Sequence, residues 1–354
     1  MEITTLGEII SLQRGYDLTE KQRKLGAVPI VGSAGIHGYH SIAKVKGPGV
    51  TLGRSGASFG KVTFIKDDYW PHNTTIFVTD FKGNDPLFVR YLLESLDFSS
   101  LNSGSAQQSL NRNFVYPVKV RKFALSEQRR IADILSAYDE LIENNRRRIR
   151  ILETMARALY REWFVHFRYP GHENIPFVKS PLGEIPKGWE VKKLGDVAEL
   201  NYGKALKKED RREGRFPVFG SSGIVGTHDA NLVKGPGIII GRKGNVGSVF
   251  WCDDDFFVID TAYFVASSLP LRFLFYVLPT LNFINSDAAV PGLSRNQAYS
   301  LEIFVPSAAL LTKFCASADT YEHEATNLKR QIQNLRRTRD LLLPHLLSEQ
   351  SRIR

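Results

Sequence analysis

Cysteine and methionine are rare in this sequence, which has two of each among 354 residues. The two cysteines, Cys252 and Cys315, are too few for a disulfide framework or a cysteine-rich zinc site, which favours a reducing compartment. Long apolar runs are also missing, since no stretch reaches the roughly 18 uncharged residues that a membrane helix requires. The first residues lack the basic segment and apolar core of a secretory signal. We therefore expect a cytoplasmic protein with no membrane partner.

Signatures of catalysis are missing as well. A nucleotide-binding phosphate loop requires Gly, four residues and then Gly-Lys-Ser/Thr, whereas residues 56–62 have only three intervening residues and no hydroxyl after the lysine. Residues 241–247 have the wrong glycine spacing for a Rossmann fingerprint. The Asn/Asp-Pro-Pro-aromatic motif of DNA methyltransferases and a His pair at metal-ligand spacing do not occur. We therefore expect no catalysis, no metal and no cofactor in this chain.

Positive charge is in excess. Lys and Arg number 47 against 37 Asp and Glu, which gives a net charge of +10. Such an excess points to a polyanionic partner, most often nucleic acid, although a basic protein without that partner fits the charge equally well. The apolar fraction of 43% is typical of globular proteins. The length suits two domains of roughly 100–200 residues each.

The chain is an internal repeat. Residues 6–56 and 194–244 align at a constant offset of 188 without a gap, and 22 of the 51 positions are identical. The similarity resumes where Leu110-Asn111-Arg112-Asn113 matches Leu293-Ser294-Arg295-Asn296. A period this long indicates a duplicated domain and excludes a short solenoid repeat.

Each half of the chain contains two kinds of sequence. The first part has short β-like runs separated by glycine-rich turns, with one helical segment at 87–96, and predicts a mixed α/β domain. The second part, at 126–165 and about 308–343, has apolar residues at alternating spacings of four and three, which is the pattern of a coiled-coil seam. The expected fold is α+β, with two tandem mixed α/β domains separated by two long helices that form an antiparallel coiled coil. Two separate surface helices are the alternative.

The domain boundaries follow from these patterns. We expect a first α/β domain at 1–123, a first helix at 124–166, a proline- and glycine-rich linker at 167–190, a second domain at 191–305, and a second helix with a tail at 306–354. Trp189 should be a buried anchor where the second domain begins. Asn145 and Arg339 are polar positions on the seam that can fix its register.

Glycine-rich loops carry the candidate DNA contacts. Gly53-Arg54-Ser55-Gly56 and Gly241-Arg242-Lys243-Gly244 each follow a β-like run and place cations where the backbone is slim. A tight hairpin whose arginine pairs with a carboxylate is the alternative. Residues that both halves share are expected to contact phosphate or serve the fold, namely Arg54, Arg242, His40 and His228. Positions that differ, or that carry bidentate donors, are candidates for base readout: Ser55, Lys61, Gln107, Gln108, Arg112, Asn113, Lys243, Asn245, Arg295 and Asn296.

Three segments carry a family resemblance. The segments IPKGWEVKKLGDV (185–197), GSAQQSLNRN (104–113) and SEQRRIADIL (126–135), together with the duplication, resemble the specificity subunit of type I restriction-modification systems. The resemblance implies that two target-recognition domains read the two different halves of a bipartite site in double-stranded DNA. A non-catalytic two-module scaffold on a coiled coil, without DNA readout, is the alternative.

The resemblance also implies partners for the long helices. They would dock modification (methyltransferase) subunits, expected to be two, and restriction (endonuclease and translocase) subunits would join afterwards. S-adenosylmethionine, ATP and Mg²⁺ are expected on those subunits. Family members carry a Glu-Gln pair at the entry to the long helix in each half of the chain. Here the pair is present at 127–128 and absent from 306–314. The docking residues implied are the seam positions Tyr138, Ile142, Ile149, Leu152, Leu159, Leu328, Ile332, Leu335 and Leu342.

Overall fold

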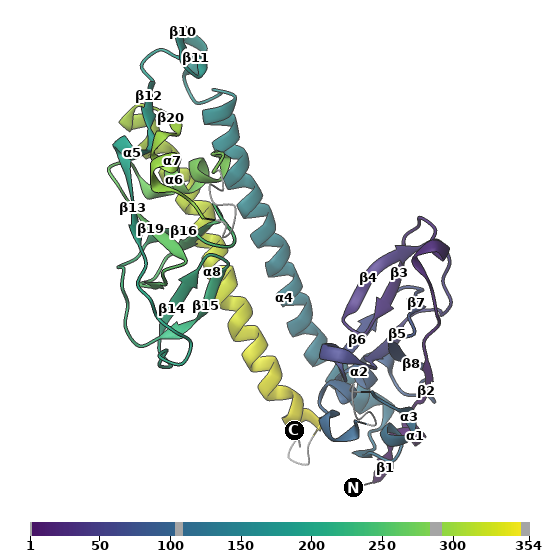
Figure 1. Cartoon of the computed structure of the whole chain (residues 1–354). Coiled ribbons are helices and arrows are strands. Elements are labelled where there is room, and N and C mark those ends of the chain that lie inside the picture. The colour runs from purple at the N-terminus through teal and green to yellow at the C-terminus, as the bar shows by residue number, and fades with distance from the viewer. Residues whose placement is uncertain (1, 103–108, 284–291, 348–354) are drawn as a thin grey trace. The chain divides into compact units, whose positions relative to one another are not determined.

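The computed structural model describes residues 2–102, 109–283 and 292–347 (Figure 1). The chain forms two compact units, each containing part of both long helices. Unit 1 comprises Met1–Arg146 and Arg330–Arg354, and unit 2 comprises Arg147–Lys329. We call the sheet-bearing parts of units 1 and 2 the first domain and the second domain.

In its described residues, the first domain has three small sheets and three short α-helices. The four-stranded sheet has the order β2 (Ser11–Arg14), β8 (Thr75–Asp80), β5 (Gly49–Gly53) and β6 (Val62–Ile65). The other sheets are β4 (Gly35–His40), β3 (Val28–Gly32) and β7 (Trp70–Pro71), and the pair β1 (Ile3–Thr5) and β9 (Lys119–Arg121). The helices are α1 (Leu6–Ile9), α2 (Pro86–Glu94) and α3 (Arg112–Val115). The β-like runs predicted in this half, GVTLG (49–53), KVTFI (61–65) and TTIFV (74–78), form β5, β6 and β8. The apolar side chains of β5 and β8 fill the core between sheet and helices.

The second domain repeats this plan. Its four-stranded sheet has the order β13 (Ala198–Tyr202), β19 (Ala262–Ser267), β16 (Gly237–Gly241) and β17 (Val249–Cys252). The remaining strands are β15 (Gly223–His228), β14 (Phe216–Gly220) and β18 (Phe257–Val258), with β12 (Glu190–Lys193) paired to β20 (Glu302–Val305). The helices are α5 (Leu194–Val197), α6 (Leu271–Val277) and α7 (Arg295–Ser300). The predicted duplication is therefore confirmed at the level of strand order.

A linker hairpin and an aromatic cluster precede the second domain. The hairpin joins β10 (Phe177–Ser180) to β11 (Gly183–Pro186). Directly after it, Trp189 is only 8% exposed, and its ring lies 5.8 Å from that of Phe164 and 5.7 Å from that of Tyr169. The predicted burial of Trp189 is confirmed.

The two long helices have nearly the predicted extent. Helix α4 covers Leu125–Tyr160 and is followed by a π-helical turn at Arg161–Val165. Helix α8 covers Ala308–Leu347 and passes through Pro344, beyond the end predicted near Leu343. A proline normally ends a helix, but here Leu346 beyond it is buried in the first domain's core, which favours continuing the helix. None of the helices described in the structure is both long and apolar enough to cross a bilayer.

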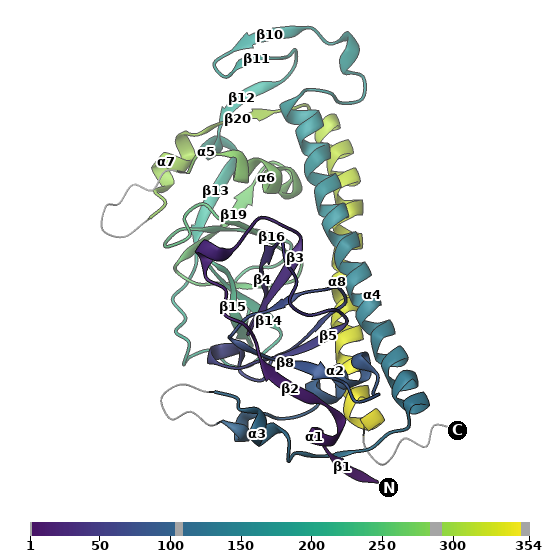
Figure 2. The same cartoon turned by 90° about the vertical axis from the view of Figure 1, so that its right-hand side faces the viewer.

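Within each unit, α4 and α8 pair in opposite directions (Figure 2). In unit 1, Asn145 Nδ2 donates to Gln331 Oε1 at 3.2 Å and Arg339 pairs with Asp139, so both polar seam positions make contacts across the helices. In unit 2, Arg148 pairs with Glu324 at 2.9 Å. The antiparallel coiled coil is confirmed, and the alternative of two separate surface helices is wrong.

Candidate nucleic-acid interface

Both arginine loops make the same backbone contact with a later segment of their domain. In the first domain β5 ends at Gly53, and the carbonyl of Arg54 accepts a hydrogen bond from the Leu110 amide at 2.8 Å. In the second domain the carbonyl of Arg242 accepts one from the Leu293 amide at 2.8 Å. The repeat therefore brings each glycine-rich loop against the segment, far along the chain, that carries the second predicted arginine.

The first domain has an open cleft at this junction. It has a volume of about 530 Å³, and its lining includes Arg14, Arg54 and Arg112. Arg54 Nη1 donates to the backbone carbonyl of Asn73 at 3.5 Å, and Arg112 Nη1 donates to that of Leu12 at 3.1 Å. Neither arginine has an ion pair with a carboxylate among the described residues. The hairpin alternative, in which a carboxylate neutralises the loop arginine, is therefore wrong for Arg54.

Arg14 is the third cation of this cleft. Its Nη2 lies 3.4 Å from Asp17 Oδ1, and both side chains are more than half exposed, so water screens the pair strongly. Asp17 also accepts a hydrogen bond from Asn73 Nδ2. The cleft therefore holds three guanidinium groups and one carboxylate, a balance that suits a phosphate backbone.

In the second domain the two arginines stack on tyrosines. The Arg242 guanidinium carbon lies 4.8 Å from the centre of the Tyr202 ring, and that of Arg295 lies 4.0 Å from it. Both guanidinium groups are also 5.8 Å from the Tyr263 ring centre. Arg242 Nη1 donates to the Asp260 carbonyl at 3.0 Å, so this arginine too has a backbone partner instead of a carboxylate.

Tyr263 supports this stack from inside the core. Its side chain is 1% exposed, and its hydroxyl donates to the Leu293 carbonyl at 3.1 Å. Burial raises the pKa of Tyr263, which keeps the hydroxyl neutral and able to donate. The aromatic pair is thus a fixed platform beneath two cations.

Sequence reasoning did not identify Arg14, Tyr202 or Tyr263. At the constant offset of 188, Arg14 aligns with Tyr202, and both directly precede a glycine that the two halves share. This alignment could have identified the position from sequence. It shows an arginine in one half and a tyrosine in the other, next to a glycine that both halves share.

The two shared histidines are buried and serve the fold. His40 is 3% exposed, and its Nδ1 accepts a hydrogen bond from the Lys24 amide at 3.0 Å. His228 is 7% exposed, and its Nδ1 accepts one from the Arg212 amide at 3.2 Å. Two roles were predicted for these rings, and contact with a DNA phosphate is the wrong one. A buried imidazole that accepts from a backbone amide cannot reach a phosphate.

The base-readout candidates differ in accessibility. Lys61 Nζ donates to the Ala34 carbonyl at 2.7 Å, and Asn245 Nδ2 donates to Ser222 Oγ at 3.1 Å, so both already have partners. Ser55 is half-buried beside Ser109. The side chains of Asn113, Lys243 and Asn296 are exposed. Gln107 and Gln108 lie outside the described residues. Base readout by any of these side chains stays a prediction.

The predicted docking residues face inward. Ile142, Ile149, Leu328 and Ile332 are buried, and Tyr138, Leu152, Leu159, Leu335 and Leu342 are partly buried. Because the first four are already covered within this chain, a partner subunit cannot contact them directly. The large apolar side chains that α4 leaves exposed are Leu141, Ile151 and Met155.

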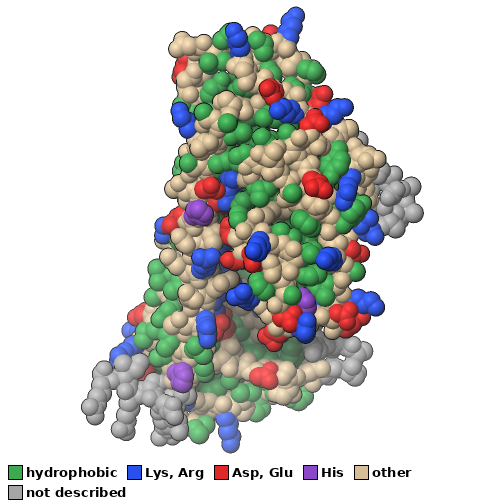
Figure 3. All heavy atoms as spheres, turned by 90° about the vertical axis from the view of Figure 1, so that its left-hand side faces the viewer, with side chains coloured by type: hydrophobic (Ala, Val, Ile, Leu, Met, Phe, Trp, Pro, Cys, Tyr) green, Lys and Arg blue, Asp and Glu red, His purple; other side chains and the backbone are tan. Residues whose placement is uncertain are grey.

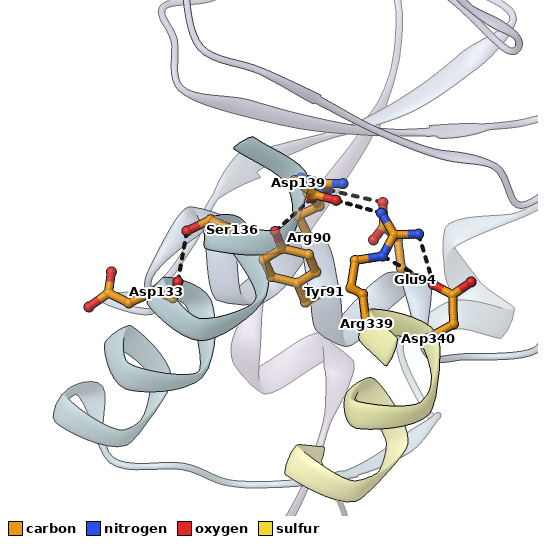
Figure 4. Close-up of polar contacts among 8 residues, drawn as sticks. All are labelled: Arg90, Tyr91, Glu94, Asp133, Ser136, Asp139, Arg339 and Asp340. Atoms are coloured by element: carbon orange, nitrogen blue, oxygen red, sulfur yellow. Dashed lines mark hydrogen bonds and ion pairs between the residues drawn. The ribbon is translucent and has the colours of Figure 1, made fainter. Parts of the chain in front are cut away.

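A polar network, here called the helix anchor, ties α4 and α8 to the first domain (Figure 4). Asp139 on α4 accepts from the Tyr91 hydroxyl at 2.7 Å, pairs with Arg90 at 2.8 Å and also pairs with Arg339 on α8. Burial alone would raise the pKa of Asp139, but Arg90 and Arg339 outweigh it and lower that pKa. Asp139 therefore stays ionised and joins three elements.

Unit 2 has a related anchor with fewer ion pairs. Arg272 on α6 donates to Asp319 on α8 at 2.7 Å and lies 3.7 Å from the centre of the Trp251 ring. The Tyr276 hydroxyl donates to Glu322, in the place where Tyr91 donates to Asp139 in unit 1. The tyrosine–carboxylate contact is thus repeated, but Asp139 pairs with two arginines, whereas Arg272 pairs with Asp319 and not with Glu322.

One face of the molecule carries surface charges of both signs. On the face drawn in Figure 3, Lys and Arg side chains are interspersed with Asp and Glu. Among the described residues no three His, Cys, Asp or Glu side chains come together in a way that could hold a metal ion. The arginine loops therefore indicate a polyanionic ligand more specifically than the mixed charge of this surface does.

Comparisons with known proteins agree with this architecture. The family model described as type I restriction modification DNA specificity domain matches residues 1–154 and 186–308. The chain is 25% identical over 348 residues to the type I restriction enzyme MjaIX specificity subunit of Methanocaldococcus jannaschii, covering 86% of this chain and 78% of that one. It is 25% identical over 158 residues to the EcoprrI specificity subunit of Escherichia coli, covering 43% and 39%.

A solved structure has the same fold. The type I restriction-modification S subunit from M. genitalium superposes with a TM-score of 0.67 at 18% identity, covering 99% of this chain and 96% of that one. At that identity the likeness concerns the fold alone.

Proposed function

Because this chain belongs to the family of type I restriction-modification DNA specificity subunits, we propose that it directs a restriction-modification complex to an asymmetric, bipartite DNA target. The first domain would read one half of the site and the second domain the other. Transfer of the methyl group and cleavage would belong to partner subunits, since the chain carries no catalytic motif. This complex would act in the cytoplasm.

One observation carries the DNA-binding part of the proposal. Both domains bring a loop arginine and an arginine from a later segment to the same place, Arg54 with Arg112 and Arg242 with Arg295. Guanidinium groups without carboxylate partners are suited to phosphate oxygens and to base edges. Because the side chains around the arginines differ between domains, the two half-sites should differ in sequence.

The long helices supply the rest of the proposal. Helix α4 has 36 residues, about 54 Å at 1.5 Å per residue, which suits a spacer between two recognised blocks. Modification subunits, expected to be two, would dock on faces of the helices outside the seam, and restriction subunits would join them. S-adenosylmethionine, ATP and Mg²⁺ would bind those subunits.

The decisive experiment is methylation-site mapping in cells that express this chain with a cognate modification subunit. The expected result is two different short blocks that flank a fixed run of unread base pairs. Insertion of one heptad at matching points of α4 and α8 should lengthen that run by about three base pairs, because 10.5 Å of helix corresponds to about three steps of 3.4 Å. Changed blocks with an unchanged gap would show that the helices do not set the spacing.

Binding measurements separate this proposal from a scaffold without DNA readout. Affinity for a random duplex should fall steeply with salt, because bound arginines displace condensed counterions. Affinity that does not change with salt, together with no mapped site, would reject the proposal. Methyl transfer by the purified chain alone would reject the assignment of catalysis to its partners.

A further inference from the structure

Arg295 lacks the partners that a partly buried guanidinium normally has. Its Nε atom is buried and has no hydrogen-bond acceptor among the described residues. Its contacts are instead with ring faces, 4.0 Å from the Tyr202 ring centre and 5.8 Å from that of Tyr263. Leaving a buried donor unsatisfied is costly, so such a group calls for an explanation. An acceptor that arrives with a ligand supplies one.

The aromatic pair fixes the plane of this guanidinium. The rings of Tyr202 and Tyr263 lie 5.0 Å apart at 54°, and Arg242 lies 4.8 Å from the Tyr202 ring on the same platform. Stacking restricts the rotation of a flat cation while leaving its edge donors free. Two cations held together in this way favour a ligand with strong acceptors.

The described residues of the first domain include no such platform, although they include the same two arginines. Alignment places Arg14 opposite Tyr202, and Ile76 faces the cleft opposite Tyr263. Arg112, the counterpart of Arg295, is exposed and donates to the Leu12 carbonyl at 3.1 Å. The domains therefore share the arginines and differ in what supports them.

We propose that Tyr202 is a specificity-determining positioning residue of the second domain. It holds the Arg295 guanidinium for a base edge with two adjacent acceptors, the O6 and N7 atoms of guanine. Arginine reads this edge with two parallel hydrogen bonds, which requires a fixed plane. Arg14, at the same position of the first domain, is exposed and contacts phosphate instead. This inference rests on the proposed function.

The test compares variants of the full chain in complex with a modification subunit. Tyr202→Leu removes the platform, Tyr202→Phe keeps the ring, and Arg14→Leu is the matched control in the first domain. The readouts are the methylated sites, the affinity for duplexes substituted at each guanine of the second half-site, and the salt dependence of binding. Melting temperatures show whether each variant is folded.

Tyr202→Leu should reduce discrimination at one guanine of the second half-site by roughly 5- to 100-fold, with an unchanged salt slope. Tyr202→Phe should stay within about twofold of the original protein, since the ring carries the effect. Arg14→Leu should weaken all duplexes alike, lower the salt slope by about one, and leave both half-sites as they were. If Tyr202→Leu does not fold, Arg295→Lys serves instead, and should lose the same guanine preference while keeping its charge.

Other outcomes overturn the inference. A uniform loss for Tyr202→Leu, with a lower salt slope, would place Arg295 on a phosphate. An unchanged second half-site, or equal damage from Tyr202→Phe, would remove the role of the ring. Failure of the proposed function looks different, because the unmodified complex would then methylate no bipartite site.

Discussion

The two domains share a framework and differ in the side chains around the arginines and at the helix anchors. Each has the same strand order and a loop arginine bonded to a later arginine segment. In the first domain the arginines line an open cleft with Arg14, whereas in the second they stack on Tyr202. The anchors to the helices also differ. The carboxylate that Tyr91 binds, Asp139, pairs with two arginines, whereas Glu322, which accepts from Tyr276, has no ion pair among the described residues.

The difference separates two requirements on a duplicated protein. Backbone hydrogen bonds and buried histidines are repeated because both copies must fold in the same way. Side chains that face the ligand or the helices have changed because each copy has its own half-site and its own helix neighbours. The predictions below test this division, from the largest effect to the smallest.

Trp189 tests a feature of the second domain for which the described part of the first has no counterpart. Trp189→Ala should cost about 3 kcal/mol or more, within the range for removing a large buried aromatic side chain. Thermal unfolding should show a transition of unit 2 at a lower temperature, with that of unit 1 unchanged. A single transition at the original temperature would contradict the role of Trp189 as an anchor.

The helix anchors should differ in strength. Asp139→Ala removes one of the two carboxylate partners of Arg90 and of Arg339, leaves Tyr91 without its acceptor, and should cost about 2–3 kcal/mol. Glu322→Ala removes one hydrogen-bond acceptor and should cost about 1 kcal/mol. Chemical denaturation of both variants measures the contrast, and equal losses would show that the extra ion pairs of unit 1 contribute nothing.

Acid should weaken the anchor of unit 1. The pKa of Asp139 is lowered in the folded protein, so its contribution to stability is complete above the unfolded pKa of about 4. That contribution is lost as the pH falls through the lower, folded pKa. Asp139→Asn should remove this part of the acid dependence, which denaturation at several pH values below 5 would reveal.

The shared loop arginines should contribute equally to DNA binding. Arg54→Ala and Arg242→Ala should each lower the salt slope by about one, and each lower affinity about tenfold at 0.1 M salt, if each contacts one phosphate. The double variant should show the sum. A change of half-site preference in either single variant would show that its arginine reads a base.

The smallest expected effect is that of a histidine pair on the stability of unit 1. Burial lowers the pKa of His37 and of His72, whose rings lie 5.2 Å apart near Arg23. Neutral rings therefore stabilise unit 1 fully above the unfolded pKa of about 6.5, and this contribution is lost as the pH falls below it. The aligned positions in the second domain are Val225 and Ile259. His37→Val with His72→Ile should make the melting temperature of unit 1 less sensitive to pH between about 7.5 and 5.

Much of the fold was predictable because its signals are local or periodic. The offset of 188 revealed the duplication, and the four-three spacing gave both helices and the polar seam positions Asn145 and Arg339. The stop near Leu343 was wrong, because burial of Leu346 in a distant core overrides the local effect of Pro344.

The candidate site was predictable only in part. Its arginines stood in glycine-rich or repeated segments, whereas Tyr202 and Tyr263 looked like ordinary strand residues. Their contact with Arg295 joins β13, β19 and α7, which only the folded sheet brings together. The seam residues were correctly identified as apolar, but periodicity alone does not tell whether a helix or a partner subunit covers them.

The position of Leu346 has a consequence for synthesis on the ribosome. The first domain's core includes this residue, although 183 residues of unit 2, Arg147–Lys329, are translated between the two parts of unit 1. At roughly 5–20 residues per second that delay lasts about 10–40 s. During this time the nascent first domain lacks the end of α8 and exposes apolar surface. The domain made first is therefore completed last, and a chaperone that binds nascent chains would find its main target at the N-terminal end.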